Sequence, residues 1–146
     1  MITMGVFLDT NFFLSLVHPK DTNAKRGGEL LQELSTGIHG LLYTSNLVIA
    51  EAATLTAART KGNPVILQDL EDLFYGESKL AEILTVTGDI ERETWKLFIQ
   101  VNANLRSKAK LMSFIDIGHV ILAQRHQVEK IASFDDHFDR FLTRLF

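Results

Sequence analysis

Residues 5–11 read Gly5-Val6-Phe7-Leu8-Asp9-Thr10-Asn11, in which four residues without charge or polar side chains are followed directly by three polar ones. Such a run without polar alternation is typical of a strand covered on both faces of a sheet. A carboxylate buried at the end of this strand costs several kcal/mol unless a cation or hydrogen-bond donors compensate it. Asp9 is therefore either the N-cap of the next helix, a role that its polar neighbours could also fill, or a metal ligand at the sheet edge.

Short apolar runs and amphipathic stretches alternate along the rest of the chain. Further strands are predicted over 41–44, 81–86 and 130–134. Helices are predicted over 10–17, 22–35, 45–59, 65–75, 89–105, 113–125 and 136–145. Strands separated by helices predict an α/β fold with a central, mostly parallel sheet, in which ligands bind beyond the carboxyl ends of the strands.

Composition narrows the class of protein. At 146 residues the chain is expected to form one domain over residues 1–146. The absence of cysteine excludes disulfides and thiolate chemistry and fits a reducing compartment. No apolar run reaches the length of a membrane span, so we expect a cytoplasmic protein without membrane contacts. The net charge of −3 gives no overall attraction to nucleic acid, so any such contact must be local.

Glu51 lies in the middle of a helical stretch rich in alanine and leucine. Its neighbours at helical spacing include Leu47, Val48 and Leu55, and no lysine or arginine stands at those positions to pair with it. Glu51 is therefore either a ligand in a buried site or a residue that the helix turns outward to solvent.

Asp116 and Asp135 also have two interpretations each. Ser113 followed three residues later by Asp116 resembles a capping box, and this role is compatible with metal binding because a carboxylate has two oxygens. Asp135 follows a predicted strand, and Asp136 beside it could take either a capping or a ligand role. His119 is three residues from Asp116, but a single histidine on an apolar helix is more often structural, so it is left out of the site.

Convergence of the four acids would make them repel one another until a divalent cation bound among them. Oxygen ligands of this kind favour Mg²⁺ or Mn²⁺, and such a site indicates phosphate chemistry. The basic residues Arg106, Lys108 and Lys110 could touch a phosphate backbone, although a solvated loop is the preferred interpretation.

Four segments of the chain resemble the motifs of the PIN domain family. The strand leading into Asp9 is similar to the first motif, Glu51 in a mid-chain helix to the second, and the segment 113–116 at the start of an apolar helix to the third. The segment 133–138, Ser-Phe-Asp-Asp-His-Phe, resembles the last motif, in which Thr or Ser stands two residues before the acid and an aromatic residue three after it. This pattern selects Asp135 over Asp136.

The resemblance covers nearly the whole chain and implies an α/β/α sandwich around a parallel sheet. Active members of the family are metal-dependent ribonucleases. The acids expected to hold one or two Mg²⁺ or Mn²⁺ ions and to act in catalysis are Asp9, Glu51, Asp116 and Asp135. The residues expected to orient them are Thr10, Asn11, Ser113 and Ser133. Many small prokaryotic members are VapC-type toxins, so the expected partners are an RNA substrate, a cognate antitoxin and a second copy of the chain.

Three other functions are compatible with parts of this pattern. A phosphatase of the haloacid dehalogenase type also begins with a strand and an aspartate, but it needs a second aspartate where Asn11 stands. The chain could also be a PIN nuclease of RNA processing without an antitoxin. The last alternative is a PIN module that binds RNA or protein without cutting.

Overall fold

The computed structural model describes residues 5–146 and contains one five-stranded sheet. Its strands are β1 (Gly5–Leu8), β2 (Leu41–Ser45), β3 (Glu82–Leu84), β4 (Lys130–Ala132) and β5 (Thr143–Leu145). They lie in the order β3-β2-β1-β4-β5, and all four neighbouring pairs are parallel. The first strand is therefore central, as its uninterrupted apolar sequence predicts.

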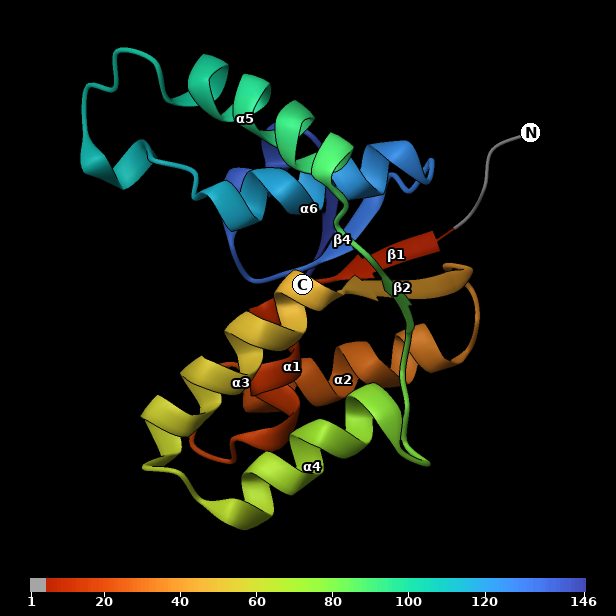
Figure 1. The fold of residues 1–146 in the computed structure, drawn as a ribbon. Coiled ribbons are helices and arrows are strands. Elements are labelled where there is room, and N and C mark those ends of the chain that lie inside the picture. The colour runs from red at the N-terminus through yellow and green to blue at the C-terminus, as the bar shows by residue number, and fades with distance from the viewer. Residues whose placement is uncertain (1–4) are drawn as a thin grey trace.

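Helices cover both faces of this sheet. They are α1 (Thr10–Val17), α2 (Ala24–Ser35), α3 (Asn46–Thr60), α4 (Pro64–Tyr75), α5 (Gly88–Asn102) and α6 (Phe114–Arg125), with short 3₁₀ helices η1 (Lys108–Lys110) and η2 (Asp136–Arg140). Figure 1 shows α1 to α4 on one side of the strands and α5 with α6 on the other. The prediction of a three-layer α/β/α sandwich with a parallel sheet is confirmed.

The core lies where β1 meets the helices that flank it. Val6, Phe7 and Leu8 have no exposed surface, and neither do Phe12 and Phe13 of the helix that follows. Burying a large apolar side chain contributes about 1.5–3 kcal/mol. This packing fixes the end of β1, and with it the position of Asp9, against both layers of helices.

The predicted helix over 136–145 is wrong. Residues 136–140 form the single turn η2, and Thr143–Leu145 form β5, which extends the sheet beside β4. Phe138 and Leu142 are both buried, and their spacing of four imitates a helical stripe. The unpaired edge of β4 provides backbone hydrogen-bond partners that this local pattern does not reveal.

The predicted helix over 89–105 ends earlier, at Asn102, whose side-chain amide pairs with both backbone groups of Met112 at 2.9 and 3.0 Å. The other elements lie within a few residues of their predicted bounds. Across residues 5–146, no helix combines the length and the apolar character that crossing a membrane requires.

Candidate active site

One cavity at the carboxyl edge of the sheet contains all four predicted acids. It has a volume of about 250 Å³, and its lining includes Asp9, Glu51, Asp116 and Asp135 together with Arg59. These acids come from the end of β1, from α3, from the first turn of α6 and from the residue before η2. Residues far apart in the sequence therefore converge beyond the strand ends, where parallel sheets bind ligands.

Asp9 is the most firmly held of the four acids. Its Oδ1 accepts a hydrogen bond from the backbone N–H of Thr10 at 2.8 Å, and its Oδ2 accepts one from Ser133 Oγ at 2.7 Å. Asp9 is also the N-cap of α1 and is 3% exposed. The capping role and the cavity position therefore coexist, because different lone pairs of one carboxylate can serve each.

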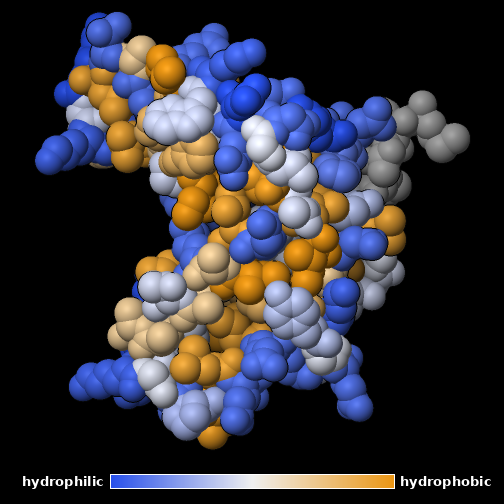
Figure 2. All heavy atoms as spheres, in the orientation of Figure 1, coloured by the Kyte–Doolittle hydropathy of each residue, from blue (hydrophilic) through white to orange (hydrophobic). Residues whose placement is uncertain are grey.

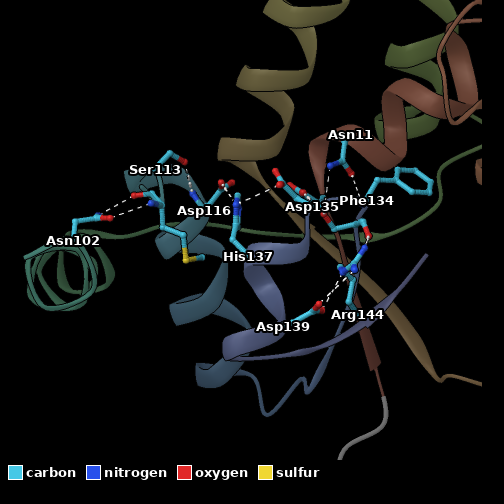
Figure 3. A network of polar contacts seen from close by, with 12 residues as sticks. Asn11, Asn102, Ser113, Asp116, Phe134, Asp135, His137, Asp139 and Arg144 are labelled. Atoms are coloured by element: carbon cyan, nitrogen blue, oxygen red, sulfur yellow. Dashed lines mark hydrogen bonds and ion pairs between the residues drawn. The ribbon is translucent and has the colours of Figure 1, made fainter. Parts of the chain in front are cut away.

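Ser133 connects two segments of the site. Its hydroxyl donates to Asp9 and accepts from the backbone N–H of Asp135 at 3.1 Å and from Asn11 Nδ2 at 3.4 Å. Asn11 Oδ1 in turn accepts from the backbone N–H of Phe134 at 3.2 Å. Figure 3 shows Asn11 and Phe134 facing one another across this junction. The network ties the start of α1 to the loop after β4.

Glu51 reaches the cavity from α3. Ser45 caps this helix by accepting from the N–H of Val48 at 3.2 Å, and this cap sets where the helix begins. Glu51, Leu55 and Arg59 all line the cavity and follow one another at intervals of four residues. The α3 helix therefore turns Glu51 toward the other acids and not away from them.

Asp116 and Asp135 lie on either side of His137 (Figure 3). His137 Nε2 is 2.9 Å from Asp116 Oδ2, and His137 Nδ1 is 3.3 Å from Asp135 Oδ1. Ser113 caps α6 by accepting from the N–H of Asp116 at 3.1 Å, which leaves the Asp116 carboxylate free to face the histidine. The neighbouring Asp136 is exposed and does not line the cavity.

His119 lies behind Asp9 and is completely buried. Its Nε2 is 3.5 Å from Asp9 Oδ1, which is long for a hydrogen bond, and neither ring nitrogen has a hydrogen-bond partner. The ring is enclosed by the aromatic rings of Phe7 and Phe138, with centroids 5.0 and 6.4 Å away. Burial lowers the pKa of His119 to about 4, so the imidazole is neutral at pH 7.

The electrostatics of the cavity favour proton or metal uptake. Burial, which outweighs its hydrogen bonds, raises the pKa of Asp9 to about 6. Burial also raises the pKa of Asp116 to about 6, with a further contribution from the charge of Asp9. Neighbouring carboxylates resist being ionised at the same time, and a bound divalent cation stabilises their ionised forms. The donor set therefore fits a hard cation such as Mg²⁺ or Mn²⁺.

Two nitrogen donors stand beside the carboxylates and were not predicted as site residues. His119 has a ring nitrogen within 4.8 Å of oxygens of Asp9 and Glu51, and His137 has the same relation to Asp116 and Asp135. The signal for His119 was its spacing from Asp116, and the signal for His137 was its place directly after the last acids. Arg59 was also missed, although it stands eight residues after Glu51 on one helical face.

Solved structures provide the first comparison with known proteins, whereas the comparison with curated proteins found no match. VapC20 of Mycobacterium tuberculosis, a toxin that cleaves the sarcin–ricin loop, aligns with a TM-score of 0.72 and 20% identity over 92% of this chain and 93% of its own. VapBC2 of Rickettsia felis, bound to a promoter DNA fragment, aligns with a TM-score of 0.62 and 17% identity over 97% of this chain and 98% of its own. FitAcB of Neisseria gonorrhoeae aligns with a TM-score of 0.61 and 15% identity over 97% of this chain and 96% of its own.

These identities establish likeness of fold. The family comparison is more specific, because the PIN domain matches residues 6–141, which include β2, β3, β4, most of β1 and all four acids. The chain belongs to the PIN domain family.

Proposed function

We propose that the protein is a metal-dependent endoribonuclease that cleaves phosphodiester bonds and serves as the toxin of a type II toxin–antitoxin pair in the cytoplasm. The observation that carries this proposal is the convergence of four carboxylates in one cavity of a PIN domain. Such a donor set has little use in a module that only binds RNA, because uncompensated carboxylates would repel its phosphates.

The four acids Asp9, Glu51, Asp116 and Asp135 would hold Mg²⁺ or Mn²⁺, directly or through water. When bound, the metal lowers the pKa of an attacking water and neutralises charge that develops on the phosphoryl group. The protein's own contribution is to keep these carboxylates in place. Their separate origins in the chain mean that folding, and not local sequence, creates the site.

Side chains around the acids fix their orientation. Ser133 and the backbone of Thr10 hold both oxygens of Asp9, and Asn11 holds the loop that carries Asp135. Ser113 fixes the first turn of α6, from which Asp116 projects. Ligands held in this way do not have to be ordered when a metal binds, and outer partners of this kind typically contribute 10–100-fold to metal affinity.

RNA as the substrate and an antitoxin as the partner rest on the family and on fold likeness to VapC20, a toxin that cleaves the sarcin–ricin loop. We propose that an antitoxin segment covers the acidic cavity and places an arginine among the carboxylates, since a planar guanidinium fits them bidentately. A homodimer is the proposed assembly. A PIN nuclease without an antitoxin would share the same cavity, and the neighbouring gene would distinguish the two.

The test is cleavage of a panel of structured and unstructured RNAs by the purified protein. We expect cleavage with Mg²⁺ or Mn²⁺, its loss in EDTA and its return when the metal is restored. The Asp116→Asn variant should cut far more slowly with its circular dichroism spectrum unchanged. Failure of the wild-type protein to cut any RNA with either metal would favour a non-catalytic binding module.

A further inference from the structure

A second cavity of opposite charge lies beside the acidic one. Its volume is about 380 Å³, and it opens where the loop after α1, the end of α3 and the start of α4 come together, at the lower left of Figure 1. Among residues 5–146, the lining includes Lys20, Arg59 and Lys61 and no carboxylate. Arg59 also lines the acidic cavity. We call the larger cavity the basic cavity.

The α3 helix connects the two cavities. Glu51 and Arg59 are eight residues apart, which corresponds to about 12 Å along a helix axis. Leu55 lies between them and lines the acidic cavity with both. One face of a single rigid helix thus carries an acid of the candidate metal site and the first cation of the basic cavity, so their separation is fixed by backbone geometry.

The cations of the basic cavity are available to a ligand. No carboxylate of residues 5–146 lies within ion-pair distance of Lys20 or Lys61, and both lysines are exposed. Arg59 approaches Asp21 only at 4.0 Å, with about half of the arginine side chain in solvent. A separation of 4.0 Å is the upper limit for an ion pair, and the guanidinium itself is half exposed, so a stronger anion can draw it away from Asp21.

Stabilisation of helix ends explains only part of this charge. Arg59 and Lys61 stand at the carboxyl end of α3, where cations favour the helix dipole. Lys20 comes from a different segment, between α1 and α2, and has no such role. At the start of α4 the Asn63 side chain already accepts from the N–H groups of Val65 and Ile66, so that helix end is satisfied. The side-chain cations are what a ligand would meet.

We propose that the basic cavity binds a backbone phosphate of the same RNA strand whose scissile phosphate enters the acidic cavity. This inference rests on the proposed ribonuclease function and adds where the strand runs: from the four acids, past Arg59, toward Lys20 and Lys61. Since the chain has a net charge of −3, attraction to RNA has to come from local clusters. Lysine and arginine contacts to phosphate supply such affinity without reading the base sequence.

A polynucleotide fits this pair of cavities better than an acidic protein segment does. One RNA strand carries phosphates at regular intervals, so one phosphate can meet the metal site while another of the same strand meets the cations. His18 also lines the basic cavity, and its buried Nδ1 has no hydrogen-bond partner.

The test measures binding of a fluorescein-labelled, single-stranded oligouridylate by anisotropy over a range of salt concentrations. The Asp135→Asn background keeps the probe intact. Lys61→Gln and Lys20→Gln should each weaken binding and reduce the slope of log K against log salt by about 0.7, the value for one phosphate contact to a single strand. Lys25→Gln, an equal loss of charge at an exposed position of α2, should leave that slope unchanged.

Cleavage by otherwise wild-type protein provides the second readout. Lys61→Gln should raise KM and leave kcat unchanged, because a contact away from the reacting phosphate binds ground state and transition state equally. An unchanged salt slope in both lysine variants, or equal changes with Lys25→Gln, overturns the proposal. Binding of a polyglutamate peptide that depends on Lys61, without such dependence for oligouridylate, overturns it in favour of a protein partner.

These outcomes separate the two proposals. If wild-type protein cuts no RNA but Lys61→Gln still reduces the salt slope, the ribonuclease function fails and the phosphate contact stands. If cleavage proceeds and neither lysine affects slope or KM, the ribonuclease function stands and the basic cavity has no part in binding.

Discussion

The two sides of the acidic cavity are built differently. On the deep side, Asp9 is nearly buried, accepts two hydrogen bonds and lies against the enclosed ring of His119. On the open side, Asp135 has a side chain that is 48% exposed, and its contact is with His137, itself only partly buried. The deep side is fixed by the core of the fold, whereas the open side is formed by a short loop and one turn of η2.

This difference indicates a division of roles. A ligand on the deep side is positioned before any metal or substrate arrives, and the cost is a carboxylate that ionises reluctantly. Ligands on the open side keep solvent access and can adjust. The space-filling view is hollowed between the part formed by α5 and α6 and the part formed by α3 and α4 (Figure 2).

The largest expected effect is that of Asp9→Asn. The asparagine has the size of the aspartate and can still accept from Thr10 N–H, so the fold should persist. Cleavage should fall by more than the roughly 10–100-fold that is typical of outer-shell changes, because a ligand itself is lost. Single-turnover cleavage with saturating Mn²⁺ measures this, and near-normal rates would remove Asp9 from the reaction.

A matched pair tests the open side. Asp135→Asn should reduce cleavage strongly, although less than Asp9→Asn, since neighbouring side chains on this side can adjust. Asp136→Asn changes the charge equally at an exposed position outside the cavity and should cut normally. Without metal, Asp135→Asn should melt at or above the wild-type temperature, because repulsion with Asp9 is relieved. Equal losses in both variants would contradict the assignment of the fourth acid.

Ser133→Ala tests how far the deep side depends on its hydrogen bonds. The serine hydroxyl holds Asp9 and the loop of Asp135 at once, and its loss should weaken Mg²⁺ binding about 10–100-fold. Because that hydrogen bond lowers the pKa of Asp9, the pH at which metal binds should move upward. Calorimetric titration with Mg²⁺ at several pH values measures both, with Ser35→Ala on exposed α2 as the control.

Sequence patterns predicted the deep side better than the open side. Asp9 directly follows β1, and the apolar composition of this strand predicts its place in the centre of the sheet. One local pattern therefore predicts the position of the strand and of the acid at its end. At the end of the chain, η2 and β5 depend on pairing with β4 and on burial of Phe138, which are contacts between distant segments. For the same reason His119 was assigned a structural role: its spacing from Asp116 was visible, but its approach to Asp9 from another element was not.

The smallest expected effect is on stability without metal, measured against pH. Asp9 and Asp116 have pKa values raised from 3.8 to about 6, so the folded protein keeps protons that the unfolded chain loses between those values. Stability therefore falls as pH rises through this window. His119 acts oppositely, because its pKa is lowered from 6.5 to about 4 and the unfolded chain binds the proton. Between pH 4 and pH 6 the two aspartates lower the stability as pH rises and His119 increases it, so the net result is a loss of stability.

Variants separate these contributions, each of which is on the order of 3 kcal/mol for a pKa change of this size. His119→Gln is neutral at every pH and places an amide near Asp9, so the loss of stability should become steeper than in the wild type. Asp9→Asn removes one of the two aspartates whose ionisation lowers stability. The remaining aspartate and His119 then offset each other, so stability should change little between pH 4 and pH 6. Guanidinium unfolding in EDTA across this range measures each slope. A slope in His119→Gln that equals the wild-type slope would contradict a lowered pKa of His119.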